Sequence, residues 1–177
     1  MAKRPTPKLN AGELWEYALS TLSRRALSTD ELRQRLARRA ENTADIPDIL
    51  HRLQDSRYLD DSRFAESFAQ SRLDSQGHGR QRVLRDLRTR RVAPPVAEQV
   101  VKTIYDGTDE VTLIEEYLAR KYRNRSLPAL LQDPLQLASA YRKLRYAGFS
   151  SSPSIRVLKR YSAQADELES CEEGEEA

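Results

Sequence analysis

The chain has 177 residues, of which 32% are charged and 38% hydrophobic. This composition is typical of helices with large solvent-exposed faces, as in an elongated helical array. Its single cysteine, Cys171, excludes an internal disulfide and a zinc site built from cysteines. No run of about 20 apolar residues exists, and no apolar segment follows the basic start, so we predict a cytoplasmic protein that does not enter a membrane.

Charge is unevenly distributed along the chain. Residues 166–177 hold seven of the 27 acidic residues and no lysine or arginine, which leaves 30 basic against 20 acidic residues in the rest. A basic body favours an anionic partner, most commonly nucleic acid. The alternative interpretation is an arginine-rich protein from an arginine-rich proteome.

Three helix starts are marked by capping residues. Asn10 precedes Glu13 and Ser28 precedes Glu31, in each case at the three-residue spacing of a capping box. The third start is Asp60, flanked by apolar residues that suit a hydrophobic staple. Apolar periodicity then predicts helices over 10–24, 28–40 and 45–54, a fourth from 60 to the glycines at 77 and 79, a fifth around 83–87, and a sixth from 94–95.

Internal repetition indicates how these helices are organised. A shift of 51 residues superimposes apolar positions of the first three helices on the next three, and a shift of 57 extends the pattern more faintly into the last third. Chance alignment of leucine-rich helices is the alternative for that third copy. No strand pattern is present, so we predict an all-α fold. Its expected parts are a basic extension (1–9), three three-helix repeats (10–57, 58–107 and 108–165, the last with an insert at 124–134) and an acidic tail (166–177), disordered after Leu168.

Residues suited to catalysis are scarce. The two histidines, His51 and His78, have no second histidine or cysteine at metal-ligand spacing. The stretch Gly77–Arg80 lacks the lysine and frame of a phosphate-binding loop, so an interhelical turn explains it better. No serine lies in a nucleophile elbow. We therefore predict a protein that is not an enzyme and needs no metal or cofactor.

Arginines are concentrated in the fifth helix. Helical geometry places Arg82 and Arg85 opposite the apolar face and Arg88 on its flank. Guanidinium groups suit phosphates and protein carboxylates, and recurrence of such faces favours one basic stripe along the array. The alternative is that each cluster is a solvated helix face. The candidate binding residues are Arg82, Arg85, Arg88, Arg80, Arg90, Arg91, Arg33, Arg38, Arg142 and Lys143.

Several of these residues form a familiar pattern. The stretch Leu22-Ser23-Arg24-Arg25-Ala26-Leu27-Ser28, then Glu31-Leu32 and Leu36, resembles one hallmark of the RecX family. The stretch Tyr58-Leu59-Asp60-Asp61-Ser62-Arg63-Phe64-Ala65 resembles a second, and Gly79 with Val83 and Leu87 resembles a third. The resemblance is strong from Leu14 to Ile104 and weaker to Tyr161. Two departures alter turns and add charge: Arg57 replaces a usual glycine, and Arg90-Arg91-Val92 replaces a usual Lys-Gly-Ile. The resemblance assigns structural roles to Tyr58, Leu59, Asp60, Asp61, Phe64 and Gly79.

The resemblance implies a curved array of three tandem three-helix modules that is similar to helix-turn-helix units. It also implies a monomeric regulator that binds the RecA filament on single-stranded DNA along its groove. Such proteins inhibit ATP hydrolysis, strand exchange and the stimulation of repressor cleavage, without a cofactor. Two alternatives remain from the residues alone: a helical protein that binds nucleic acid directly, without a recombinase, and an enzyme.

Overall fold

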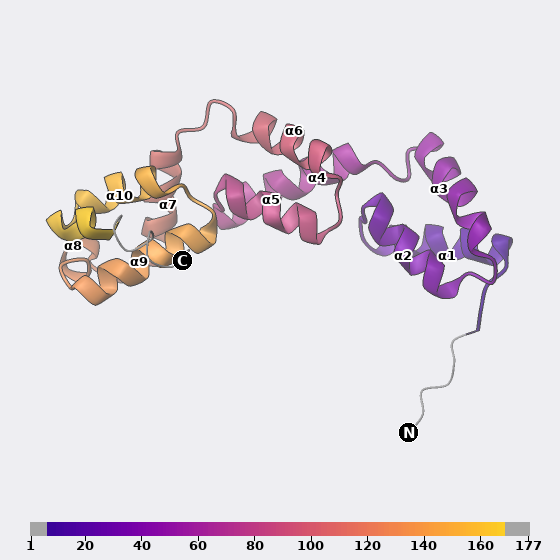
Figure 1. Cartoon of the computed structure of the whole chain (residues 1–177), viewed down its shortest axis with the longest axis horizontal. Helices are drawn as coiled ribbons and strands as arrows, with labels where there is room; N and C mark the ends of the chain where they lie inside the picture. Colours follow the sequence, from indigo (N-terminus) through magenta and orange to yellow (C-terminus); the bar gives the residue numbers. More distant parts are fainter. Residues whose placement is uncertain (1–6, 169–177) are drawn as a thin grey trace, which may run out of the picture. The chain divides into compact units, whose positions relative to one another are not determined.

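The computed structural model describes residues 7–168, and these form an all-α protein with no named strand. Figure 1 shows the helices along the chain. Three short segments are not α-helical: the 3₁₀ turns η1 (Thr43–Asp45) and η3 (Ala163–Leu168) and the π-helix η2 (Arg72–Gln76). The α-helices are α1 (Ala11–Arg24), α2 (Thr29–Arg39), α3 (Ile46–Asp55), α4 (Asp61–Ser71), α5 (Arg80–Thr89), α6 (Pro94–Tyr105), α7 (Glu110–Lys121), α8 (Leu127–Leu130), α9 (Pro134–Ala147) and α10 (Ser151–Lys159).

The predicted caps are confirmed. Asn10 and Ser28 each form a capping box, with the glutamate three residues later bonding back to the cap. The Asp60 carboxylate accepts from the Arg63 amide at 2.9 Å and so caps α4. The predicted insert at 124–134 interrupts the regular helices but carries a short one of its own, α8.

The chain divides into two compact units. Unit 1 comprises residues 1–68 and 87–100, and unit 2 comprises residues 69–86 and 101–177. The boundary passes through α4, α5 and α6, so each of these helices contributes to both units. The predicted second repeat is thus shared between the units, and the division into three repeats stays a prediction.

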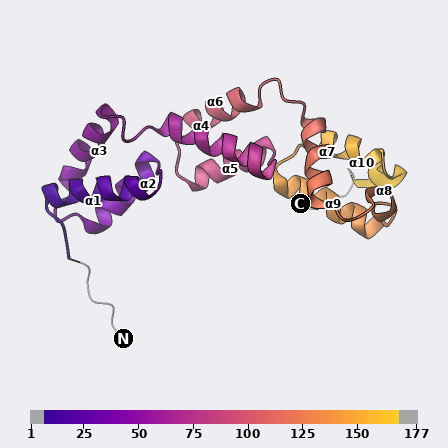
Figure 2. The same cartoon turned by 180° about the vertical axis from the view of Figure 1, so that it is seen from behind.

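The core of unit 1 lies among its first three helices, which are side by side in both views (Figures 1 and 2). The extended residue before them is fixed as well, since Leu9 exchanges backbone hydrogen bonds with Arg39 and Glu41 at 2.8 Å each. Buried side chains from all three helices and from the turns beside them fill the centre: Leu14, Ala18, Leu27, Leu32, Leu36, Ala40, Ile46, Ile49, Leu50, Leu53 and Leu59.

The core of unit 2 lies among α7, α9, α10 and η3, which are also grouped together in both views (Figures 1 and 2). Leu118, Leu144, Phe149 and Leu158 are fully buried in it. Leu168 is buried in the same cluster, so the first residues of the predicted acidic tail belong to the folded unit. The disorder predicted after Leu168 concerns residues outside those described, as does most of the N-terminal extension.

A backbone contact joins the start of α5 to the end of α9 within unit 2. The Gly79 amide donates to the Ala147 carbonyl at 2.9 Å, and the Gln81 amide donates to the Gly148 carbonyl at 3.1 Å. Amides at the start of a helix and carbonyls at its end have no hydrogen-bond partner within the helix. Here the amides of α5 and the carbonyls of α9 bond to each other, and the positive end of one helix dipole meets the negative end of the other. A Cβ on Gly79 would lie 2.4 Å from the Gly148 oxygen, and one on Gly148 would lie 2.2 Å from the Arg82 nitrogen. Only glycines allow this approach.

Five residues in the described chain have a left-handed backbone. Three are glycines, and two are Arg57 and Arg91, with φ of 57° and 59°. Arg57 and Arg91 are also two positions at which the sequence departs from the RecX pattern. Arginine in this conformation costs about 1–2 kcal/mol that glycine does not.

We expect Gly148→Ala to destabilise the protein by more than about 2 kcal/mol, because both the left-handed φ and the backbone contact oppose a side chain. Gly107→Ala is the matched control, since Gly107 has φ of +73° but open space around it. It should cost only about 1 kcal/mol. Urea unfolding followed by circular dichroism measures both, and equal losses would contradict the role of the contact.

Candidate nucleic-acid interface

The residues of the Tyr58–Ala65 motif mostly bond inward within unit 1. Leu59 is buried in the core, and Phe64 is buried on the inner face of α4. The Asp61 carboxylate accepts from the Thr29 amide at 2.7 Å and from its hydroxyl at 3.0 Å, which ties the start of α4 to the start of α2. Tyr58 is the exception, with 62% of its surface exposed. The motif is therefore mainly a joint between helices.

Arg90 completes this joint. Its guanidinium pairs with the Glu31 carboxylate at 2.8 and 3.0 Å, donates to the Ala26 carbonyl at 3.3 Å, and lies over the rings of Phe64 and Phe68 at 4.9 and 5.6 Å. The backbone carbonyl of Arg90 accepts from the Ser28 hydroxyl. These contacts engage a side chain that the sequence predicted to be a binding residue.

The other predicted binding residues of unit 1 differ in their contacts. Arg91 pairs with Asp30 at 3.5 Å, and the Gln34 side-chain oxygen accepts from it at 2.6 Å when that amide faces Arg91. Arg33 also pairs with Asp30, at 2.9 Å. Arg88 is exposed and lies 3.8 Å from an equally exposed Glu98. Arg38 is exposed at the end of α2.

In unit 2 the structure gathers predicted arginines around an exposed tyrosine, Tyr146, in the last turn of α9. The Arg82 guanidinium lies over the Tyr146 ring, 4.6 Å from its centre, and Arg85 donates to the Tyr146 carbonyl at 3.1 Å. Arg142 is exposed one helical turn before Tyr146, on the same face of α9. We call Arg82, Arg85, Arg142 and Tyr146 the Tyr146 patch.

The electrostatics of the Tyr146 patch are dominated by its cations. A hydrogen bond from Arg82 and the charge of Arg82 lower the pKa of the Tyr146 phenol. Asp86 neutralises part of this charge, since it pairs with Arg82 at 3.0 Å and with Arg72 at 3.6 Å. Arg85 and Arg142 are both exposed to solvent. An open aromatic ring among arginines suits bases and phosphates together.

Two further predicted residues lie near the patch in sequence. Arg80 is exposed at the first residue of α5, and Lys143 follows Arg142 on α9, where its amine lies 5.4 Å from the ring centre of Tyr122. Tyr146 itself was missed at the sequence level. The available signal was its place four residues after Arg142, on a helix whose other tyrosine, Tyr141, is buried.

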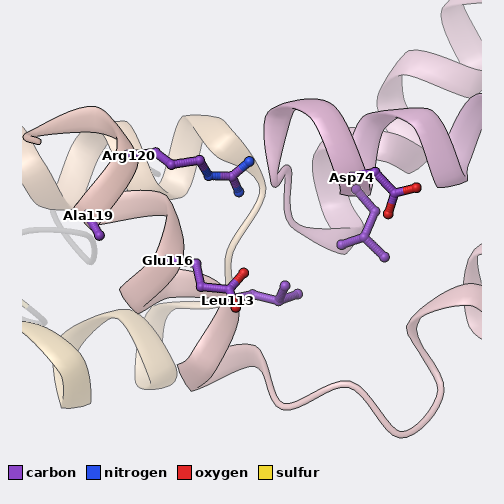
Figure 3. A pocket seen from close by; sticks show the side chains of 6 residues that line it. Asp74, Leu113, Glu116, Ala119 and Arg120 are labelled. Atoms are coloured by element: carbon purple, nitrogen blue, oxygen red, sulfur yellow. The ribbon is translucent and has the colours of Figure 1, made fainter.

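A second feature of unit 2 is an open hollow between η2 and α7 (Figure 3). Its volume is about 650 Å³. Figure 3 shows Glu116, Ala119 and Arg120 projecting from α7, with Asp74 on the facing helix. Leu73 and Leu113 complete the lining, which is therefore made of two carboxylates, one guanidinium and three apolar side chains.

The described residues form neither a metal site nor a membrane-spanning helix. Within residues 7–168 no group of three or more His, Cys, Asp or Glu side chains is placed to hold a metal ion. In the same range, no helix has the length and apolar character needed to cross a bilayer.

Known proteins resemble this chain along most of its length. A sequence model for "RecX, second three-helix domain" matches residues 60–101. A protein of Vibrio parahaemolyticus named "Regulatory protein RecX" is 32% identical over 148 residues, which are 84% of this chain and 89% of that protein. The chain belongs to the RecX family.

Two more comparisons define the extent of the likeness. A "Regulatory protein RecX" of Photobacterium profundum is 32% identical over 120 residues, and the match spans 66% of this chain but only 45% of that protein. The crystal structure of RecX from Lactobacillus salivarius has a TM-score of 0.66 at 21% identity, covering 86% of this chain and 97% of the other. At that identity the structure shows a shared RecX fold.

We expect Arg90→Ala to lower the free energy of unfolding by about 2 kcal/mol, because it leaves the largely buried Glu31 carboxylate short of a partner. A double-mutant cycle with Glu31→Ala should give a coupling of about 1–2 kcal/mol by urea unfolding. Arg88→Ala, which removes a more exposed arginine, is the control and should change stability by less than about 0.5 kcal/mol. Equal effects of the two arginine substitutions would contradict the structural role of Arg90.

His78 gives a prediction about pH. Burial, and then the charge of Arg82, lower its pKa, and its Nδ1 atom has no hydrogen-bond partner within the described residues. The unfolded chain therefore binds a proton at His78 at a higher pH than the folded protein does. The free energy of unfolding should fall as the pH drops below about 6.5, and His78→Gln should reduce that fall. Urea unfolding at about pH 7 and 5.5 tests this, and identical slopes for the two proteins would refute it.

Proposed function

We propose that this protein is a negative regulator of RecA in DNA repair, recombination and the SOS response. It acts in the cytoplasm as a monomer, without a cofactor and without catalysing a reaction. It binds the RecA filament on single-stranded DNA along its groove, and it inhibits ATP hydrolysis, strand exchange and the stimulation of repressor cleavage. Membership of the RecX family and the regulatory name of its relatives support this role.

The observation that carries the proposal is the Tyr146 patch. Arg85 of α5 and Arg142 of α9 are exposed. Tyr146 is exposed as well: it lies one helical turn after Arg142, and its carbonyl accepts from Arg85. Guanidinium groups pair with phosphates or with carboxylates of a protein, and an aromatic ring stacks with unpaired bases. A filament of protein on single-stranded DNA offers all three kinds of group.

A second candidate function is direct binding of nucleic acid without a recombinase. The patch also suits this function, and it predicts tight binding to a naked oligonucleotide with a steep dependence on salt. Filament binding predicts the opposite order, with weak binding to the naked strand and tight binding to the filament. Fluorescence anisotropy with both probes at two salt concentrations separates the two functions.

We expect Arg85→Ala/Arg142→Ala to raise the concentration needed for half-inhibition of the single-strand-dependent ATPase of RecA by roughly tenfold, because two phosphate or carboxylate contacts are lost. The control is Arg24→Ala/Arg63→Ala, which removes the same charge from exposed sites in unit 1. An unchanged value for the first variant would exclude the patch. Absence of any inhibition by the unaltered protein at saturating ratios would exclude the proposed function.

A further inference from the structure

Three helices of the protein end in the same hydrogen-bonded turn. In each, a left-handed residue follows the last turn of the helix. Its amide bonds to the third carbonyl before it, and the next amide bonds to the fifth carbonyl before it. The left-handed residues are Arg57 after α3, Arg91 after α5 and Gly148 after α9. The three turns therefore allow a comparison within one chain.

The left-handed arginines differ in what their side chains contact. Glycine is favoured at this position because a Cβ is strained there. Arg91 is half exposed, and its guanidinium pairs with Asp30 at 3.5 Å. Arg57 is exposed, and within residues 7–168 its guanidinium makes no hydrogen bond or ion pair. The strain at position 57 is therefore not offset by a polar contact of this side chain within the part of the chain that the structure describes.

The residue that follows the left-handed position also differs. In this kind of turn it normally packs against the helix that has just ended. Val92 after α5 and Phe149 after α9 follow this rule and are buried. Tyr58 after α3 does not, since it is 62% exposed. Arg91 is exposed as well but pairs with Asp30, whereas the α3 turn exposes both its unpaired arginine and the tyrosine that follows it.

We propose that Arg57 and Tyr58 form a contact point for a protein partner, which offers a carboxylate to Arg57 and an apolar surface to Tyr58. Strained residues persist where a function retains them, and Arg and Tyr are the residue types most often responsible for affinity at protein interfaces. This inference rests on the proposed function, in which the partner is the RecA subunit of the filament.

The charges near the turn favour protein over nucleic acid. The exposed carboxylate of Asp55 lies two residues before Arg57, and Asp60 follows three residues after it. Carboxylates on both sides of Arg57 repel the phosphates of a nucleic acid. A protein interface with charges of both signs can accommodate them. The Tyr146 patch has the opposite character, with three arginines and one partly neutralising aspartate.

Arg57→Gly gives a sharp test because it removes the side chain and the strain together. The folding equilibrium constant should stay constant or rise by up to roughly fivefold, so weaker binding cannot result from unfolding. Affinity for RecA filaments assembled on a single-stranded oligonucleotide with a non-hydrolysable ATP analogue should fall at least about fivefold. Tyr58→Ser should weaken binding similarly, Arg57→Lys should keep part of the affinity, and Arg24→Ala should leave it unchanged. Affinity for the naked oligonucleotide should be the same in every variant.

Three results would overturn the proposal. Unchanged filament affinity of Arg57→Gly and Tyr58→Ser would show that the turn contacts no partner. Equal losses on the filament and on the naked oligonucleotide would assign the turn to nucleic acid instead. If the unaltered protein does not bind the filament, both the proposed function and this inference fail. The first two results would overturn only this inference and would leave the proposed function standing.

Discussion

The close approach of Gly79 and Gly148 fixes the geometry on which the candidate interface depends. The amides that begin α5 bond to the carbonyls that end α9, and no side chain fits between the two backbones. Since α5 begins there, Arg82 and Arg85 are carried to the last turn of α9, where Tyr146 lies. Two helix ends that would otherwise need capping residues or water satisfy each other, and the patch of cations is a consequence.

In unit 1 the helix ends are joined by side-chain hydrogen bonds, whereas backbone hydrogen bonds join α5 and α9 in unit 2. The Glu31 carboxylate caps α2 and also receives Arg90, while Asp61 ties α4 to Thr29. The residues that carry the family resemblance are thus mostly ones that hold helices together. This explains why the motif identifies the fold so well and the binding surface so poorly.

The sequence predicts the helices because their starts depend on local contacts. A cap and its glutamate are three residues apart, so the Asn10 and Ser28 boxes are visible without the fold. The candidate site is less predictable, because it depends on contacts between distant segments. Arg90 meets Glu31 across 59 residues, and Arg85 meets the Tyr146 carbonyl across 61. Helical periodicity indicates which side of α5 faces away from its apolar face, but not which distant residues of the chain contact that side.

The contacts of individual arginines reduce the positive charge that a partner would meet. Of the arginines of α5 and of the turn after it, Arg90 bonds inward to Glu31, Arg91 pairs with Asp30 at the surface, and Arg82 pairs with Asp86. The total charge therefore overstates what a partner meets, and the direction of each guanidinium matters more than the sum. Arg57 shows the converse, since a single outward arginine held in a strained backbone is a stronger sign of a binding role than several arginines in a favourable helix.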